Sequence, residues 1–133
     1  NSWDEAVQAK LNGYGVQICS DIGYRGPNSE GFNTPGPTWN HALMLGGVDI
    51  GYKKPYGLIQ NSWDDAHPRL NDFDTGEQLP ISILRVEARY IDAMIKQGDS
   101  YAYSFYDGFP SFDLNQALFN IFGGPSDLWN PFR

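Results

Sequence analysis

Two stretches decide the fold of this chain: residues 40–48, NHALMLGGV, and residues 56–63, YGLIQNSW. They belong to two apolar segments, 41–49 and 56–63, which residues 50–55, IGYKKP, separate. The Gly, Lys and Pro of this connection are typical of a hairpin. Because alternate side chains of a strand point to the same side, each segment presents one face to a core. The sequence therefore predicts an antiparallel pair of strands.

His41 opens the first strand, and Asn61 lies near the end of the second. In an antiparallel pair the start of one strand lies beside the end of the other, so we expect these side chains to meet, with Cβ atoms about 5 Å apart. An amide oxygen that accepts one imidazole N–H fixes the tautomer and leaves the other ring nitrogen as a base. Trp63 is expected to exclude water from that hydrogen bond.

Two short helices are expected on either side of this pair. Ser2 and Glu5 form an S-x-x-E capping box at the start of a helix over residues 3–12. Residues 88–97 place their apolar side chains on one face, and Gly98 follows as a stop signal.

Further strands are predicted over residues 16–20 and 80–86 and in residues 100–106, whose alternating Tyr and Phe side chains should form a sheet face in the core. The Gly- and Pro-rich residues 24–38 predict a long surface loop of the kind that binds ligands, and residues 64–78 predict a polar loop. The predicted fold class is α+β, with a mostly antiparallel, strongly curved sheet or half-barrel and a few short helices.

Length and charge exclude several classes of protein. The 133 residues suit one domain or one lobe of a larger one. Nine Lys and Arg against sixteen Asp and Glu give a net charge of −7, and a chain without a basic run is not expected to bind nucleic acid or anionic membranes. One cysteine excludes an intrachain disulfide. The chain does not begin with Met, so we expect a processed precursor or part of a longer chain.

Residues 40–48 followed by 56–63 resemble the second lobe of the papain-like cysteine peptidases. In that family a strand bearing His leads through a Gly-rich hairpin into a strand that ends in Asn-Ser-Trp. The resemblance is clearest over residues 3–63 and implies a papain-like C-terminal lobe over residues 1–109. The aromatic, Pro-rich tail over residues 110–133 could dock on a neighbour.

The resemblance assigns roles to three residues. His41 matches the general base, Asn61 the residue that orients it, and Trp63 the aromatic shield of their contact. The nucleophilic Cys of the family sits on a lobe that precedes the His strand, and nothing in residues 1–40 matches that lobe. Asp64 replaces the glycine that follows Asn-Ser-Trp in the family. The isolated chain is therefore expected to be inactive.

Cys19 precedes His41 and Asn61 in the order that a nucleophile would have. Its strand context and the nearby anion of Asp21 disfavour a thiolate, so we expect a half-buried structural cysteine. Under the resemblance, Cys19, Ser20 and Asn40 could instead line a substrate cleft.

Two other kinds of site have less support. A metal site would need His41, His67 and the acidic pair Asp64–Asp65, which lack the spacing of known metal motifs. Neighbouring acids such as Asp64–Asp65, or Asp72 and Asp74, suit a solvated loop better than the carboxylate pair of a glycosidase. We expect no metal and no cofactor.

Two functions follow as hypotheses. The resemblance implies a hydrolase of peptide or amide bonds, in which His41 activates a Cys carried by an N-terminal lobe, on the same or a separate chain. Its substrate would be a peptide. The alternative is a catalytically inactive peptidase-like module with a structural or binding role, for example in a larger or phage-type assembly.

Overall fold

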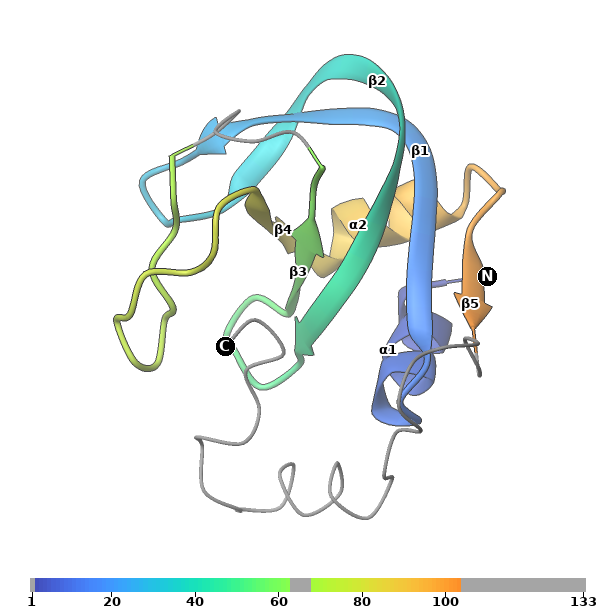
Figure 1. Ribbon diagram of the computed structural model, residues 1–133, viewed down its shortest axis with the longest axis horizontal. Helices are drawn as coiled ribbons and strands as arrows, with labels where there is room; N and C mark the ends of the chain where they lie inside the picture. Colours follow the sequence, from blue (N-terminus) through green and yellow to red (C-terminus); the bar gives the residue numbers. More distant parts are fainter. Residues whose placement is uncertain (1, 63–67, 104–133) are drawn as a thin grey trace.

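The computed structural model describes residues 2–62 and 68–103. The elements in chain order are α1 (Trp3–Leu11), β1 (Gly15–Pro27), β2 (Asn33–Asp49), β3 (Tyr56–Gln60), β4 (Ile83–Glu87), α2 (Ala88–Ile95) and β5 (Tyr101–Tyr103). The strands form one antiparallel sheet in the order β4-β3-β2-β1-β5 (Figure 1). The predicted α+β class and the pairing of β2 with β3 are confirmed. Trp63, Asp64, Asp65, His67, Phe105 and the tail over 110–133 lie outside the described residues, so what was expected of them stays a prediction.

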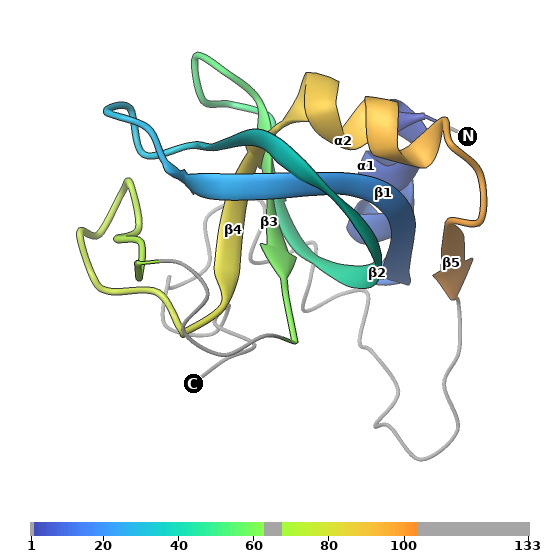
Figure 2. The ribbon, with the colours of Figure 1, turned by 90° about the horizontal axis from the view of Figure 1, so that it is seen from above.

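One face of the sheet packs against both helices and forms the core (Figure 2). Alternation supplies this face, because every second residue of a strand points to the same side. The buried core residues are Ala6, Val16, Ile18, Tyr24, Leu43, Leu45, Ile59, Leu84, Val86, Ile91, Met94 and Ile95. The predicted apolar face of α2 is among them, so that helix is amphipathic in the way the spacing indicated.

The N-terminus of α1 has two polar anchors. Ser2 is its N-cap, and the Ser2 Oγ accepts a hydrogen bond of 3.3 Å from the Glu5 N–H. The Trp3 N–H donates to Asp92 Oδ1 on α2 at 2.9 Å. These bonds satisfy two of the amides that a helix start leaves without a partner, and the second one ties α1 to α2.

The loop predicted over residues 24–38 is wrong. In its place β1 and β2 form a long, bent hairpin, and only residues 28–32 lie between the two strands (Figure 1). Strand pairing continues through Ile22–Thr38, Tyr24–Pro35 and Pro27–Asn33, with a register shift between successive pairs. The shifts accommodate prolines, which cannot donate to a regular ladder.

The glycines in this segment serve close packing. A Cβ on Gly23 would lie 2.0 Å from the carbonyl oxygen of Pro37 and 2.6 Å from the Trp39 ring. A Cβ on Gly36 would lie 2.7 Å from Arg25 Cγ. The same residue type that marks a loop in a sequence therefore allows two strands to approach here.

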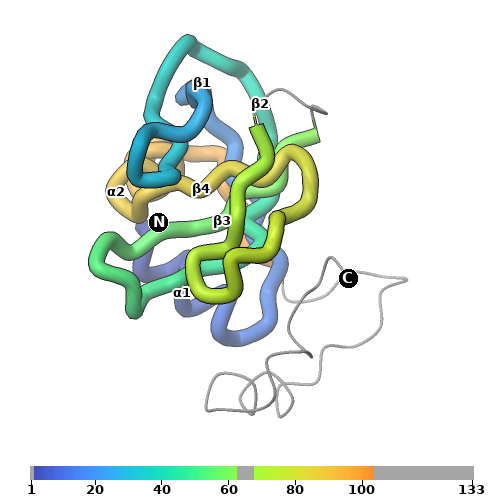
Figure 3. Tube along the Cα trace, turned by 90° about the vertical axis from the view of Figure 1, so that its left-hand side faces the viewer, coloured from blue at the N-terminus to red at the C-terminus, as the bar shows by residue number. Residues whose placement is uncertain are grey.

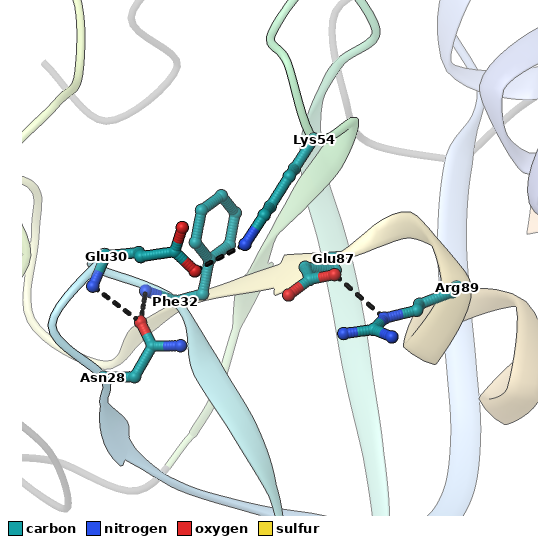
Figure 4. A network of polar contacts seen from close by, with 6 residues as sticks. All are labelled: Asn28, Glu30, Phe32, Lys54, Glu87 and Arg89. Atoms are coloured by element: carbon teal, nitrogen blue, oxygen red, sulfur yellow. Dashed lines mark hydrogen bonds and ion pairs between the residues drawn. The ribbon is translucent and has the colours of Figure 1, made fainter.

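The turn of this hairpin is held by polar side chains (Figure 4). Asn28 Oδ1 accepts from the N–H groups of Glu30 and Phe32, each at 3.0 Å. Lys54, from the connection between β2 and β3, forms an ion pair with Glu30 and places its ammonium 5.8 Å from the centre of the Phe32 ring. The turn is thereby tied to a second loop.

The hairpin folds back onto the edge of the sheet, where it meets β4 (Figure 3). The N–H of Arg85 donates to Asn33 Oδ1 at 2.9 Å. The Asn33 side chain thus forms a hydrogen bond with the backbone of β4, the strand at the edge of the sheet. The Arg85 side chain is 2% exposed. Its guanidinium lies 3.5 Å from the centre of the Phe73 ring and donates to the carbonyls of Gly31 and Asn71. This buried cation joins three segments of the chain.

The sheet face predicted around residues 100–106 is wrong for residues 101–103, the strand residues that the structure describes. Tyr101 is 55% exposed and Tyr103 is 37% exposed, on an edge strand of three residues. They pair with Gln17 and Gly15, and Tyr103 Oη donates to Gln17 Oε1 at 2.8 Å. The alternation was correct as a strand signal, but both alternating sides of this short edge strand are exposed.

Candidate functional site

His41 and Asn61 are in contact. The Nε2 of His41 lies 3.0 Å from Asn61 Oδ1. The ladder between β2 and β3 pairs Met44 with Gln60, so His41 and Asn61 are diagonal neighbours and not directly opposite. A diagonal separation is within reach of a long side chain such as imidazole. The predicted contact is therefore present, in a slightly different register from the one expected.

This contact decides which ring nitrogen carries the proton. A carboxamide oxygen only accepts hydrogen bonds, so the neutral imidazole of His41 is protonated on Nε2. Ser62 Oγ lies 3.3 Å from the same nitrogen and offers a second acceptor. The lone pair of the neutral ring is therefore on Nδ1, the nitrogen that can accept a proton.

Asn61 is held at three points. Its side chain contacts His41, its N–H donates to the Ser82 carbonyl at 2.9 Å, and its own carbonyl accepts from Gln60 Nε2 at 2.8 Å. The residue is 2% exposed. Because hydrogen bonds are stronger away from water, a buried carboxamide held in this way keeps a defined direction.

Cys19 does not join this pair. Within the β1–β2 ladder Cys19 is opposite Ala42, while its neighbour Ser20 is opposite His41. Successive strand residues face opposite sides, so the Cys19 thiol and the imidazole lie on different faces of the sheet. The thiol is 3.5 Å from Gln17 Nε2 and half-buried. The expectation of a half-buried structural cysteine agrees with this placement.

Ser20 lies beside His41, and its hydroxyl is already engaged. Ser20 Oγ donates to Gln97 Oε1 at 2.6 Å and accepts from the Ile22 N–H at 3.0 Å. Asn40 is exposed and precedes His41 on β2. Of the three residues expected to line a cleft, Ser20 is opposite the imidazole, Asn40 is its chain neighbour and Cys19 is on the other face.

Sequence reasoning misses Gln97. Its Oε1 accepts from the Asp21 N–H at 3.0 Å as well as from Ser20, and its Nε2 donates to the Asp21 carboxylate. Nearby, Ser100 Oγ accepts from the Cys19 N–H at 3.4 Å. These side chains partner the edge of β1 beyond the short strand β5. A glutamine after a helix carries no sequence signal for this role, because the contact is between residues far apart in the chain.

In residues 2–62 and 68–103, no group of three or more His, Cys, Asp or Glu side chains is arranged to hold a metal ion. No helix in the described part of the chain is both long enough and apolar enough to span a membrane.

Comparisons with protein-family models, with curated proteins and with solved structures find no match for this chain. A functional assignment therefore depends on the residues themselves and on their geometry.

Proposed function

We propose that this chain is the His- and Asn-bearing lobe of a papain-like cysteine peptidase. The single observation that carries the proposal is the 3.0 Å contact between His41 Nε2 and Asn61 Oδ1. It joins the Asn-His-Ala sequence within β2 to the Asn-Ser-Trp sequence that follows β3, the two sequence stretches on which the resemblance rests. The predicted hydrolase therefore has its base and the residue that orients it on this lobe.

The proposed reaction needs a thiol from outside the 133 residues, whose single cysteine is Cys19. A cysteine on a preceding lobe transfers its proton to His41 Nδ1, and the thiolate attacks the carbonyl carbon of a peptide or amide bond. The imidazolium then gives the proton to the leaving amine as the C–N bond breaks, which leaves a thioester. Water, deprotonated by the same nitrogen, attacks the thioester, and the proton returns to the departing thiolate.

Three features of the lobe support this role. Asn61 keeps the proton of the neutral ring on Nε2, so the nitrogen that can accept a proton is Nδ1, to which the proposal assigns the thiol. Its oxygen also stabilises the imidazolium, since a hydrogen bond to a charged donor is stronger than one to a neutral donor. Burial of Asn61 keeps this hydrogen bond shielded from bulk water.

One observation favours the alternative, an inactive peptidase-like module with a structural or binding role. The chain contains a single cysteine, Cys19, which lies on the face of the sheet opposite the imidazole. If no lobe with a thiol accompanies this one, His41 and Asn61 would remain as a structural pair.

The two functions are separated by thiol labelling of the protein expressed from its complete coding sequence. A peptidase should be labelled by a thiol-directed peptidyl inhibitor at a cysteine upstream of this chain, and His41→Ala should abolish the labelling. Cys19→Ser is the matched control and should leave labelling unchanged. Labelling at Cys19, or labelling that survives His41→Ala, would contradict the proposal. The absence of any upstream cysteine that reacts would favour the inactive module.

A further inference from the structure

Ser82 has an unusual backbone conformation next to Asn61. Its φ is 62°, and only one other non-glycine residue in the described ranges, Asp99, has a positive φ. Ser82 is 9% exposed, whereas Asp99 is exposed and follows Gly98 in the segment between α2 and β5. Residues with side chains enter the left-handed region at a cost, and such strain persists where surrounding contacts hold it.

Ser82 lies at the point where the chain enters β4. The next residue, Ile83, begins β4 and pairs with Gln60 at the end of β3. The Ser82 carbonyl then accepts the Asn61 N–H at 2.9 Å. Asn61 and Ser82 are the next pair in the register of this ladder, so the bond extends the pairing of β3 with β4 by one residue beyond the two strands.

This bond fixes the backbone of the residue that contacts the imidazole. Gln60 Nε2 holds the Asn61 carbonyl at 2.8 Å, and Ser82 holds its N–H. With both backbone groups held, the Cα–Cβ bond of Asn61 has a defined direction. A shift of the Ser82 carbonyl would turn that bond and lengthen the 3.0 Å contact with His41.

We propose that Ser82 is a positioning residue: its left-handed backbone sets the direction of the Asn61 carboxamide and thereby holds His41 in the Nε2-protonated tautomer. The structural part of this inference concerns only residues of this chain. Its catalytic consequence rests on the proposed peptidase function.

Four substitutions at residue 82 test the role of the backbone. Asn and Gly adopt a positive φ readily, whereas β-branched residues do so poorly. Ser82→Asn and Ser82→Gly should therefore keep the tautomer, while Ser82→Val and Ser82→Thr should lose it. The readout is the pair of imidazole ¹⁵N chemical shifts of His41 in the 133-residue chain. The first two variants should match the unsubstituted chain, and the last two should shift toward the average of the two tautomers.

Amide hydrogen exchange of the unsubstituted chain provides a second measurement that needs no variant. The Asn61 N–H should exchange as slowly as the amides of the β3–β4 ladder. Exchange as fast as that of an exposed turn amide would overturn the inference. A Ser82→Val chain that stays folded, with dispersed amide resonances and unchanged His41 shifts, would also overturn it.

The complete protein separates this inference from the proposed function. In an active peptidase, Ser82→Val should lower kcat at least about tenfold with little change in KM, because a small misplacement of a catalytic group costs rate. Ser82→Asn should restore the rate. If the tautomer responds to residue 82 while the complete protein neither cleaves peptides nor reacts with the thiol inhibitor, the proposed function fails and the positioning role of Ser82 stands.

Discussion

Asn61, directly after β3, is the diagonal neighbour of His41 on the adjacent strand β2, and its Oδ1 lies 3.0 Å from the imidazole Nε2. The two residues come from neighbouring strands whose pairing is set by the core residues between them. Leu45 and Ile59 are opposite each other in this pair and both are buried. The register that buries these apolar side chains is therefore the one that brings the imidazole and the carboxamide together.

If the complete protein is the proposed peptidase, removing the Asn61 carboxamide should impair its catalysis. With Asn61→Ala the imidazole loses the acceptor that keeps its proton on Nε2, so we expect kcat to fall about 100-fold with a smaller change in KM. Steady-state hydrolysis of a peptide substrate measures this. Asn12→Ala is the control, because Asn12 is an exposed asparagine at the end of α1 and should leave the rate unchanged. Equal rates for the two variants would count against the role assigned to Asn61.

Adding one methyl group at Gly23 should destabilise the hairpin. The Cβ of Gly23→Ala would lie 2.0 Å from the Pro37 carbonyl oxygen, so one of the strands must move. We expect a loss of about 2–3 kcal/mol in the free energy of unfolding. Gly26→Ala is the matched control, since the nearest atom to its Cβ would be 3.9 Å away, and it should change stability by less than about 0.5 kcal/mol. Urea denaturation of both variants measures the difference.

Truncating the buried Arg85 should be costly. Arg85→Ala would leave the carbonyls of Gly31 and Asn71 without their present donor and would open a void beside Phe73. We expect a loss of about 2–4 kcal/mol in the free energy of unfolding. Arg89 is the matched control on the neighbouring helix, because its side chain is 68% exposed. Arg89→Ala should cost less than about 0.5 kcal/mol. Similar denaturation midpoints for the two variants would contradict this view of Arg85.

The contact between α1 and α2 should weaken in acid. The Lys96 ammonium, and then the Trp3 N–H, lower the pKa of Asp92 below its ordinary value. A lowered pKa in the folded state means that the stabilisation is present above the ordinary aspartate value and is lost as the pH falls through the folded one. Because the carboxylate is partly exposed, we expect a contribution below about 1 kcal/mol.

Asp92→Asn isolates this contribution. At neutral pH the variant should be less stable than the unsubstituted chain, and the difference should shrink as the pH is lowered to about 2.5. Urea unfolding curves at several pH values measure it. A difference that stays constant over this range would show that the charge of Asp92 does not contribute.

Local signals in the sequence predicted the elements best where the pattern is regular. Ser2 and Glu5 located the start of α1, and alternation located the paired strands β2 and β3. The same signals failed where glycine and proline were taken as loop markers. At Gly23 the absence of a side chain serves strand packing, and nothing local distinguishes that use from a turn.

The residues around the His41–Asn61 pair were less predictable than the pair itself. Gln97 and Ser82 are ordinary polar residues in the sequence, and each acts through contacts with segments far from it in the chain. Arginine is a residue type that is mostly found on protein surfaces. Arg85 is nevertheless buried, by the hairpin turn and by the segment around Phe73.

Periodicity and a short connection are local properties of the chain, and for this reason the two helices, the antiparallel β2–β3 pair and the meeting of His41 with Asn61 could be predicted from the amino-acid sequence. Three further features appear only in the folded chain: Cys19 faces away from the imidazole, the hairpin folds onto β4, and the Ser82 carbonyl holds the Asn61 N–H. These features depend on register shifts and on side-chain contacts between distant segments, whose energies are settled only when the whole core packs.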